Sequence, residues 1–317
     1  MYPNSFYREL LNIVKKYNDL QYLIDVDSNR IKNKKMNLLG KMAILTGKYP
    51  EVYDFLEKNI HFLKHEINQY IGPDCTIVTF VAGYTRKVST LSTLKLLLDN
   101  GADKSISSPL ISACHHINTN STMETVELLL NYGYDPNYVM LNYTVLFKTI
   151  DTKNINGIKL LLRYKADINQ KNNYGETALM YTCGKLSEDR FYTEIIKLLL
   201  KKGADPNIIS NQGQNALMIL SKIPHHQSIF KILMKKTDLS VKNKDGVHIR
   251  KLCLPEYKHF FKKDILMVTK NMNIHMDECL ICAEENNGIV CKNNHFTCLI
   301  CLEKTGIKCE YCRTYLG

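Results

Sequence analysis

Residues 195–207, IIKLLLKKGADPN, carry the pattern that decides the fold, because copies of this stretch recur along the chain. Earlier copies read TLKLLLDNGAD at 93–103, TVELLLNYGYD at 125–135 and GIKLLLRYKAD at 157–167, and a weaker one, IFKILMKKTD, follows at 229–238. The first leucine of each triplet falls at 96, 128, 160 and 198, with Ile232 in the fifth copy. Intervals of 32, 32, 38 and 34 residues predict an array of repeats.

Each copy has the composition of a helix that ends in a tight turn. Gly101, Gly133 and Gly203 stand where the helix must stop and the chain needs a positive φ, and the Asp that follows favours a turn into the next unit. A second short helix is expected upstream of each copy, starting at Thr76, Ser108, Thr144, Thr177 and Asn215. A single helix pair cannot bury its leucine face, so the units must stack.

Helix pairs with this period resemble ankyrin repeats, and Ser108-Pro109-Leu110 comes nearest to that family's Thr-Pro-Leu-His helix start. The resemblance implies an all-α ankyrin-repeat solenoid whose concave surface binds a protein target. We expect a helical N-terminal cap at 1–73, with room for one degenerate repeat, and five repeats at 74–243. A truncated capping repeat at 244–263 and a connector at 264–276 would follow.

The cysteines and histidines of the repeats are interpreted as structural. Cys114 and Cys183 lie six residues after the starts of their inner helices, where other repeats have Ala82, Ile150 and Ser221. A thiol at such a packing position behaves as a small hydrophobic group. Cys75 and Cys253 lack the spacing of metal ligands, and the pairs His115-His116 and His225-His226 are expected to face solvent.

The C-terminal residues 277–317 carry a different signal, which is a dense set of metal-ligand residues. It reads Cys279-x2-Cys282-x8-Cys291-x3-His295-x2-Cys298-x2-Cys301-x7-Cys309-x2-Cys312. Seven thiols and one imidazole complete two tetrahedral zinc sites with none left over. Disulfides are the alternative, but nothing else in the chain suggests secretion. The sequence therefore predicts two Zn²⁺ ions in a small C-terminal domain.

This ligand order resembles a RING finger, the zinc domain of many ubiquitin ligases. The resemblance implies that Cys279, Cys282, Cys298 and Cys301 hold one ion, and that Cys291, His295, Cys309 and Cys312 hold the other. Spacing alone leaves sequential pairing open. RING domains have no catalytic residue of their own, since they act by positioning a charged ubiquitin-conjugating enzyme. The resemblance assigns the docking of that enzyme to Ile281, Ile307 and Arg313.

Two positions depart from the RING pattern. Thr305 stands where the family often has Trp, and Glu310 stands where the last ligand pair usually contains Pro. The expected function is a RING-type ubiquitin ligase whose ankyrin repeats select the target. The alternative is a non-enzymatic adaptor with a structural zinc finger, and a zinc-dependent nucleic-acid binder is a weaker third interpretation.

Composition limits the partners and the compartment. The net charge is +11, but residues 277–317 carry −2, so the excess of Lys and Arg lies in the repeats, dispersed rather than gathered with aromatic residues. This disfavours nucleic-acid binding. No apolar run approaches the roughly 20 residues that span a bilayer. Abundant unpaired thiols favour an intracellular location, in cytoplasm or nucleus. The use of Asn, Lys, Ile and Tyr resembles the ankyrin–RING proteins of large DNA viruses, which would place the chain in host cytoplasm.

Overall fold

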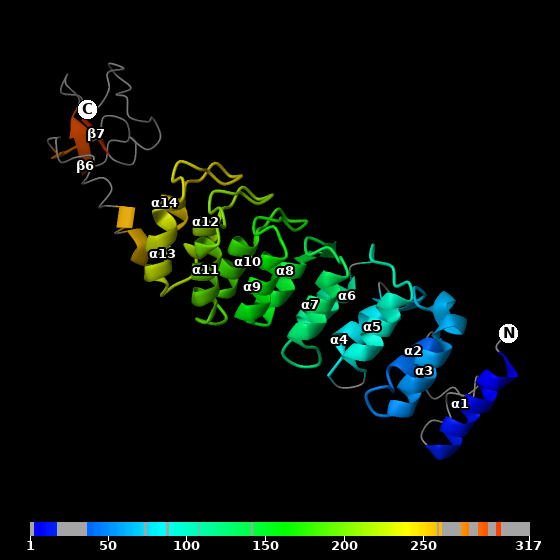
Figure 1. Cartoon of the computed structure of the whole chain (residues 1–317). Helices are drawn as coiled ribbons and strands as arrows, with labels where there is room; N and C mark the ends of the chain where they lie inside the picture. The colour runs from blue at the N-terminus through cyan, green and yellow to red at the C-terminus, as the bar shows by residue number, and fades with distance from the viewer. Residues whose placement is uncertain are drawn as a thin grey trace.

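The computed structural model shows an elongated stack of helix pairs (Figure 1). It describes residues 3–17, 37–72, 75–86, 89–106, 108–140, 142–258 and 260–261, together with the backbone of 274–278, 285–290 and 296–298. Within these residues, no helix is long and apolar enough to cross a membrane.

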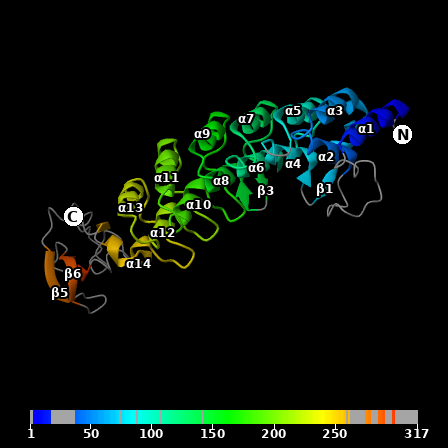
Figure 2. The same ribbon diagram turned by 90° about the horizontal axis from the view of Figure 1, so that it is seen from below.

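The helices form two rows, which Figure 2 shows one above the other. The inner helices are α2 (Leu38–Ala43), α4 (Ile77–Gly83), α6 (Ser108–His115), α8 (Val145–Asp151), α10 (Ala178–Lys185), α12 (Ala216–Leu220) and α14 (Ile249–Leu252). The outer helices are α1 (Asn4–Lys16), α3 (Pro50–Leu63), α5 (Leu91–Asp99), α7 (Met123–Asn131), α9 (Ile155–Arg163), α11 (Tyr192–Lys201) and α13 (Gln227–Met234). A 3₁₀ turn at Lys64–Glu66 follows α3.

The inner helices begin where the sequence predicts. Thr76, Thr144, Thr177 and Asn215 each accept a hydrogen bond on the side chain from the backbone N–H three residues later, at 2.9–3.4 Å. Such N-caps satisfy a backbone donor that the first helical turn leaves unpaired. The remaining predicted start, Ser108, is the first residue of α6 itself.

Outer helices α5, α7 and α11 end two residues before the predicted glycines. Gly101, Gly133 and Gly203 have φ of 102°, 88° and 94°, and Lys165, which replaces glycine in the third copy, has φ of 64°. The left-handed conformation lets the chain leave the helix while the last carbonyls still find donors. In the first copy, for example, the Ala102 N–H donates to the Leu97 carbonyl at 3.3 Å.

Two residues of each outer helix from α5 to α13 contribute to the core. They are spaced by three and have no exposed surface: Leu94 and Leu97, Val126 and Leu129, Ile158 and Leu161, Ile196 and Leu199, Phe230 and Leu233. Burying each such side chain contributes about 1.5–3 kcal/mol. The packing position between neighbouring inner helices is also fully buried, as predicted. It is occupied by Ala82, Cys114, Ile150, Cys183 and Ser221.

A ladder of side-chain hydrogen bonds joins successive repeats. In four of the five repeat turns, the backbone N–H of an Asp donates to an Asn side chain of the preceding unit. The pairs are Asp103 with Asn68 (2.8 Å), Asp167 with Asn137 (2.6 Å), Asp205 with Asn169 (2.9 Å) and Asp238 with Asn207 (2.6 Å). Asn68 follows the α2–α3 pair, so the same connection ties the N-terminal region to the first predicted repeat.

Short hairpin loops project beyond the inner helices. Strands β1 (Tyr70–Gly72) and β2 (Cys75–Thr76) pair in one loop, and β3 (Val139–Met140) and β4 (Tyr143–Thr144) pair in another. The two loops that contain Tyr174 and Asn211 stack directly on each other, because the Asn211 N–H donates to the Tyr174 carbonyl at 2.9 Å. Gly175 and Gly213 have positive φ where these loops approach most closely.

Three strands lie in the C-terminal region. Strands β5 (Ile274–Glu278), β6 (Glu285–Val290) and β7 (Phe296–Cys298) form an antiparallel sheet in the order β5-β6-β7. Next to the β5–β6 connection, Glu278 pairs opposite Glu285. Next to the β6–β7 connection, Val290 pairs opposite Phe296. The sequence interpretation included no strands here.

Candidate functional site

One side of the inner helices carries side chains that stacking leaves accessible. Four residues after each inner-helix start, the repeats have Phe80, Ser112, Lys148, Tyr181 and Ile219, all of them half-buried. The neighbouring residues Tyr84, His115, His116 and Lys185 extend this row. We call the surface formed by Phe80, Tyr84, His115, His116, Lys148, Tyr181 and Lys185 the inner-helix face.

The N-terminal half of this face is aromatic. Phe80 and Tyr84 stack with ring centroids 4.7 Å apart, and Tyr84 lies 5.2 Å from the His116 ring. Partial burial lowers the pKa of His116, and the adjacent His115 acts in the same direction. The pKa of His115 is lowered by burial and then by the nearby Lys148 ammonium. Neutral imidazoles are therefore favoured, and this part of the face offers π surfaces with few charges.

The C-terminal half is centred on Tyr181 of α10. Its ring stacks on Phe147 at 4.6 Å, and its hydroxyl donates to a carboxylate oxygen of Asp151 at 2.6 Å. Burial and this acceptor both raise the pKa of Tyr181, so it stays protonated and fixed in place. Nearby, the Lys148 ammonium lies 3.5 Å from the ring centroid of Tyr143, a close cation–π contact.

This combination of anchored aromatic rings and partly buried cations suits the binding of a protein. Aromatic side chains dominate binding energy at protein interfaces because they bury a large area at a low cost in conformational entropy. The sequence interpretation identified the repeats but missed this face. The signal that could have located the face is the residue four positions after each inner-helix start, which is half-buried in all five repeats.

The prediction for the paired histidines is partly wrong. His115 and His225 are exposed, but His116 is half-buried and only 9 % of His226 is accessible. The backbone N–H of His226 donates to the hydroxyl of Tyr257 at 3.2 Å, where the segment around Tyr257 packs on Phe230 of α13. Within the described residues, no group of three or more His, Cys, Asp or Glu is placed to hold a metal.

The predicted zinc ligands lie outside the residues whose side chains are described. These ligands are Cys279, Cys282, Cys291, His295, Cys298, Cys301, Cys309 and Cys312, and of them only Cys298 has a described backbone, in β7 opposite Gly288. The predicted docking residues Ile281, Ile307 and Arg313 also lie outside the described part. The strand order nevertheless shows that residues 279–284 connect β5 to β6 and that residues 291–295 connect β6 to β7.

Comparison with known proteins identifies the repeats. A match to the family described as Ankyrin repeats (3 copies) covers residues 80–172, 115–210 and 146–245 in overlapping segments. The chain is also 32 % identical over 174 residues to a protein named Putative ankyrin repeat protein L86, from Acanthamoeba polyphaga mimivirus. That similarity covers 48 % of this chain and 29 % of the relative. The chain belongs to the ankyrin-repeat family, whose repeats serve protein–protein interaction.

Proposed function

We propose that the inner-helix face binds a target protein, and that residues 277–317 form a two-zinc RING-type module that recruits a ubiquitin-conjugating enzyme. The observation that carries the second half is the set of eight spaced ligands, from Cys279 to Cys312. Thiolates and imidazole are the donors that zinc takes in structural sites, so these residues fit the ion.

The strand order supports two separate zinc sites. Between Glu278 and Glu285 the sequence contains Cys279 and Cys282, and between Val290 and Phe296 it contains Cys291 and His295. These two connections leave opposite ends of β6, which is six residues long. At about 3.4 Å per residue, the ends are roughly 17 Å apart. One ion cannot bridge such a distance, which favours one ion near each end.

The direction of β7 supports interleaved pairing over sequential pairing. Phe296 pairs opposite Val290, and Cys298 pairs opposite Gly288, so β7 runs back towards the β5–β6 connection. A chain continuing in that direction would bring Cys298 and Cys301 towards Cys279 and Cys282. Bound zinc would supply the folding free energy that so small a domain lacks in its apolar core.

The module's role in catalysis would be to position another enzyme. Ile281 would pack against the conjugating enzyme, with Ile307 beside it, and Arg313 would hold the ubiquitin thioester in a reactive geometry. Thr305 and Glu310 replace apolar contacts of the RING family and weaken the docking surface. The proposal is therefore a ligase that works with a restricted set of conjugating enzymes. The viral relative favours action inside a host cell.

Ubiquitin transfer by the full-length protein, measured with a panel of conjugating enzymes, tests this function. Wild type should form ubiquitin conjugates with at least one enzyme of the panel. Ile281→Ala should weaken docking and Arg313→Ala should slow transfer, both with zinc content unchanged. Ile209→Ala is a matched control, because this isoleucine lies on the repeats and is 44 % exposed. It should leave transfer intact.

A non-enzymatic adaptor is the second candidate, favoured by Glu310 and by the absence of Trp from the chain. It predicts no transfer with any conjugating enzyme, while target binding and zinc content are retained. Under that outcome, the zinc module would only present a second interaction surface.

A further inference from the structure

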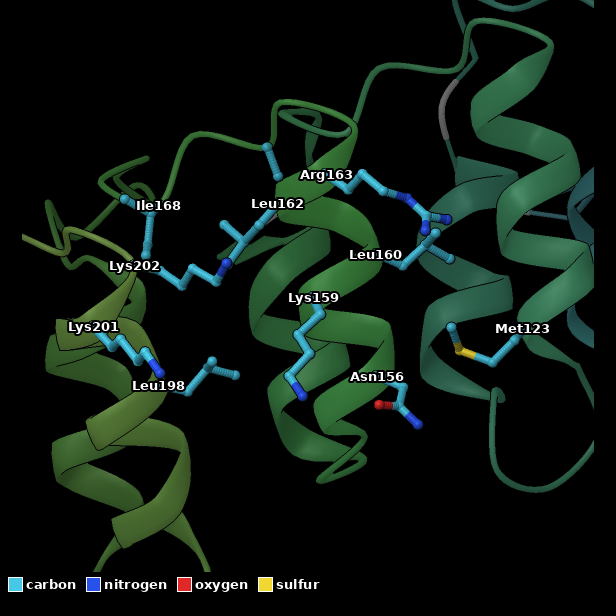
Figure 3. A pocket seen from close by; sticks show the side chains of 11 residues that line it. Met123, Asn156, Lys159, Leu160, Leu162, Arg163, Ile168, Leu198, Lys201 and Lys202 are labelled. Atoms are coloured by element: carbon cyan, nitrogen blue, oxygen red, sulfur yellow. The ribbon is translucent and has the colours of Figure 1, made fainter.

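A hollow of about 880 Å³ lies on the outer-helix side of the solenoid. Figure 3 shows it extending from α7 across the outer surface of α9 to α11. Its part between α9 and α11 is formed by Lys159, Leu162, Ile168, Leu198, Lys201 and Lys202, which we call the basic groove. None of these residues belongs to the inner-helix face.

The floor of the basic groove is apolar and accessible. Leu162 points from α9 towards α11, and Leu198 points from α11 towards α9 (Figure 3). Both leucines and Ile168 are only half-buried. The floor therefore retains apolar surface that a bound side chain can remove from water, with a gain of about 25 cal/mol per Å².

The rim of the groove carries uncompensated positive charge. Lys159, Lys201 and Lys202 are exposed, and none of the three forms an ion pair within the part of the chain that the structure describes. Figure 3 shows the Lys202 side chain reaching across towards Leu162. Arg163, which also lines the hollow, differs because it pairs with Glu127 of α7 at 2.7 Å. No residue lining the hollow is acidic.

The charge of the outer helices changes at this point along the solenoid. Helix α7 has Glu124 and Glu127 but no Lys or Arg, whereas α9 has Lys159 and Arg163 but no acidic residue. Positive charge then continues through Lys201-Lys202. A ligand with carboxylates would offset this charge. The lining contains no aromatic ring on which a nucleic-acid base would stack, and the apolar floor favours a peptide instead.

We propose that the basic groove binds an acidic peptide segment of a protein partner. Apolar side chains of the segment would contact Leu162, Ile168 and Leu198, and its carboxylates would pair with Lys159, Lys201 and Lys202. This is a second partner site, on the side of the repeats opposite to the inner helices, and it does not depend on zinc or on ubiquitin transfer.

Fluorescence anisotropy of the full-length protein with a labelled probe peptide tests the site. The probe is rich in glutamate and carries leucine at every third position. It should bind saturably, and added salt should weaken the binding. Lys159→Glu and Lys202→Glu should each weaken it by roughly tenfold or more. Lys95→Glu is the matched control, because Lys95 is exposed and occupies the position of Lys159 in the first copy, away from the groove. It should leave binding unchanged.

Two altered probes separate this site from simple charge attraction. Replacing the leucines with serine should weaken binding by roughly tenfold, and replacing the glutamates with glutamine should abolish it. Equal binding of the serine probe, or equal weakening by Lys95→Glu, would overturn the proposal. So would tighter binding of labelled single-stranded oligothymidylate that is lost in the same Lys159 and Lys202 variants, since the groove would then be a nucleic-acid surface.

Discussion

At the residue scale, glycines of this chain hold positive φ for two different reasons. A Cβ atom on Gly101, Gly133 or Gly203 would meet nothing within 4 Å. Only the backbone conformation favours glycine there, and Lys165 shows that the third copy accepts another residue. At Gly213, by contrast, a Cβ would lie 2.8 Å from the Lys244 nitrogen of the next loop. That position requires glycine for space as well as for conformation.

This difference predicts an order of stability effects. Gly203→Ala should lower the free energy of unfolding by about 1–2 kcal/mol, the cost of the left-handed conformation. Gly213→Ala should cost more, on the order of 3 kcal/mol, because the Lys244 backbone must also move. Gly184→Ala is the control: it lies within α10 with no neighbour closer than 4.0 Å, and helix propensity should make it neutral or stabilising. Urea unfolding of the three variants measures the order, and equal losses at 203 and 213 would contradict it.

Single histidines also give the stability a pH dependence. Burial lowers the pKa of His226, against a hydrogen bond with the Leu186 backbone that acts in the opposite direction. The unfolded chain, with a histidine pKa of about 6.5, then binds more protons than the folded chain as pH falls. The stability that the fold gains from holding His226 neutral is therefore fully present above about pH 6.5. It is lost as the pH drops through and below that value.

Urea unfolding between pH 7.5 and 5.5 should accordingly show a decline in wild type. His226→Gln should reduce the slope, because glutamine does not titrate. A wild-type slope equal to that of His226→Gln would contradict the assignment.

At the scale of elements, the Asp–Asn ladder explains how units of variable length keep a common orientation. The leucine interval grows from 32 to 38 residues between the third and fourth copies, yet the Asp205 N–H still reaches Asn169 at 2.9 Å. The added residues lie between α10 and α11, where Lys153 pairs with Asp189. Insertions at this turn therefore leave the connection between repeats intact.

The ladder has one break, which gives a paired prediction. Ser105 stands where later repeats have Asn137, Asn169 and Asn207. Ser105→Asn should add an acceptor for the Asp135 N–H and raise the stability by about 0.5–1 kcal/mol, the net worth of one exposed hydrogen bond. Asn207→Ala should lower it by a similar amount, about 0.5–1.5 kcal/mol. Thermal or urea unfolding checks both signs, and a loss on Ser105→Asn would show that the serine is preferred for the turn.

The elements differ in how far sequence could predict them. Helix starts such as Thr144 and Thr177, and helix ends such as Gly133, were predictable because local chemistry fixes them. The inner-helix face was not, because side chains from neighbouring repeats, such as Tyr84 and His116, come together only after stacking. His226 was mispredicted for the same reason: Tyr257, which encloses it, lies 31 residues away. The zinc ligands remain a prediction from spacing.

At the scale of the whole molecule, the chain combines a solenoid with a C-terminal stretch of closely spaced Cys and His residues. The repeats are stabilised by buried apolar side chains such as those of Leu97 and Leu129, neither of which has exposed surface. Each repeat contacts mainly its neighbours, so loss of the C-terminal region should leave most of the array folded. The buried Cys114 thiol, whose pKa burial raises to about 12, should remain unreactive throughout.

The zinc content of the full-length protein tests the central claim most directly. Native mass spectrometry of protein purified without chelator should show two zinc ions per chain. Cys291→Ala should lower that number and leave the helical circular dichroism signal of the repeats nearly unchanged. A folded wild-type protein that carries no zinc would contradict the two-zinc module, and with it the proposed recruitment of a conjugating enzyme.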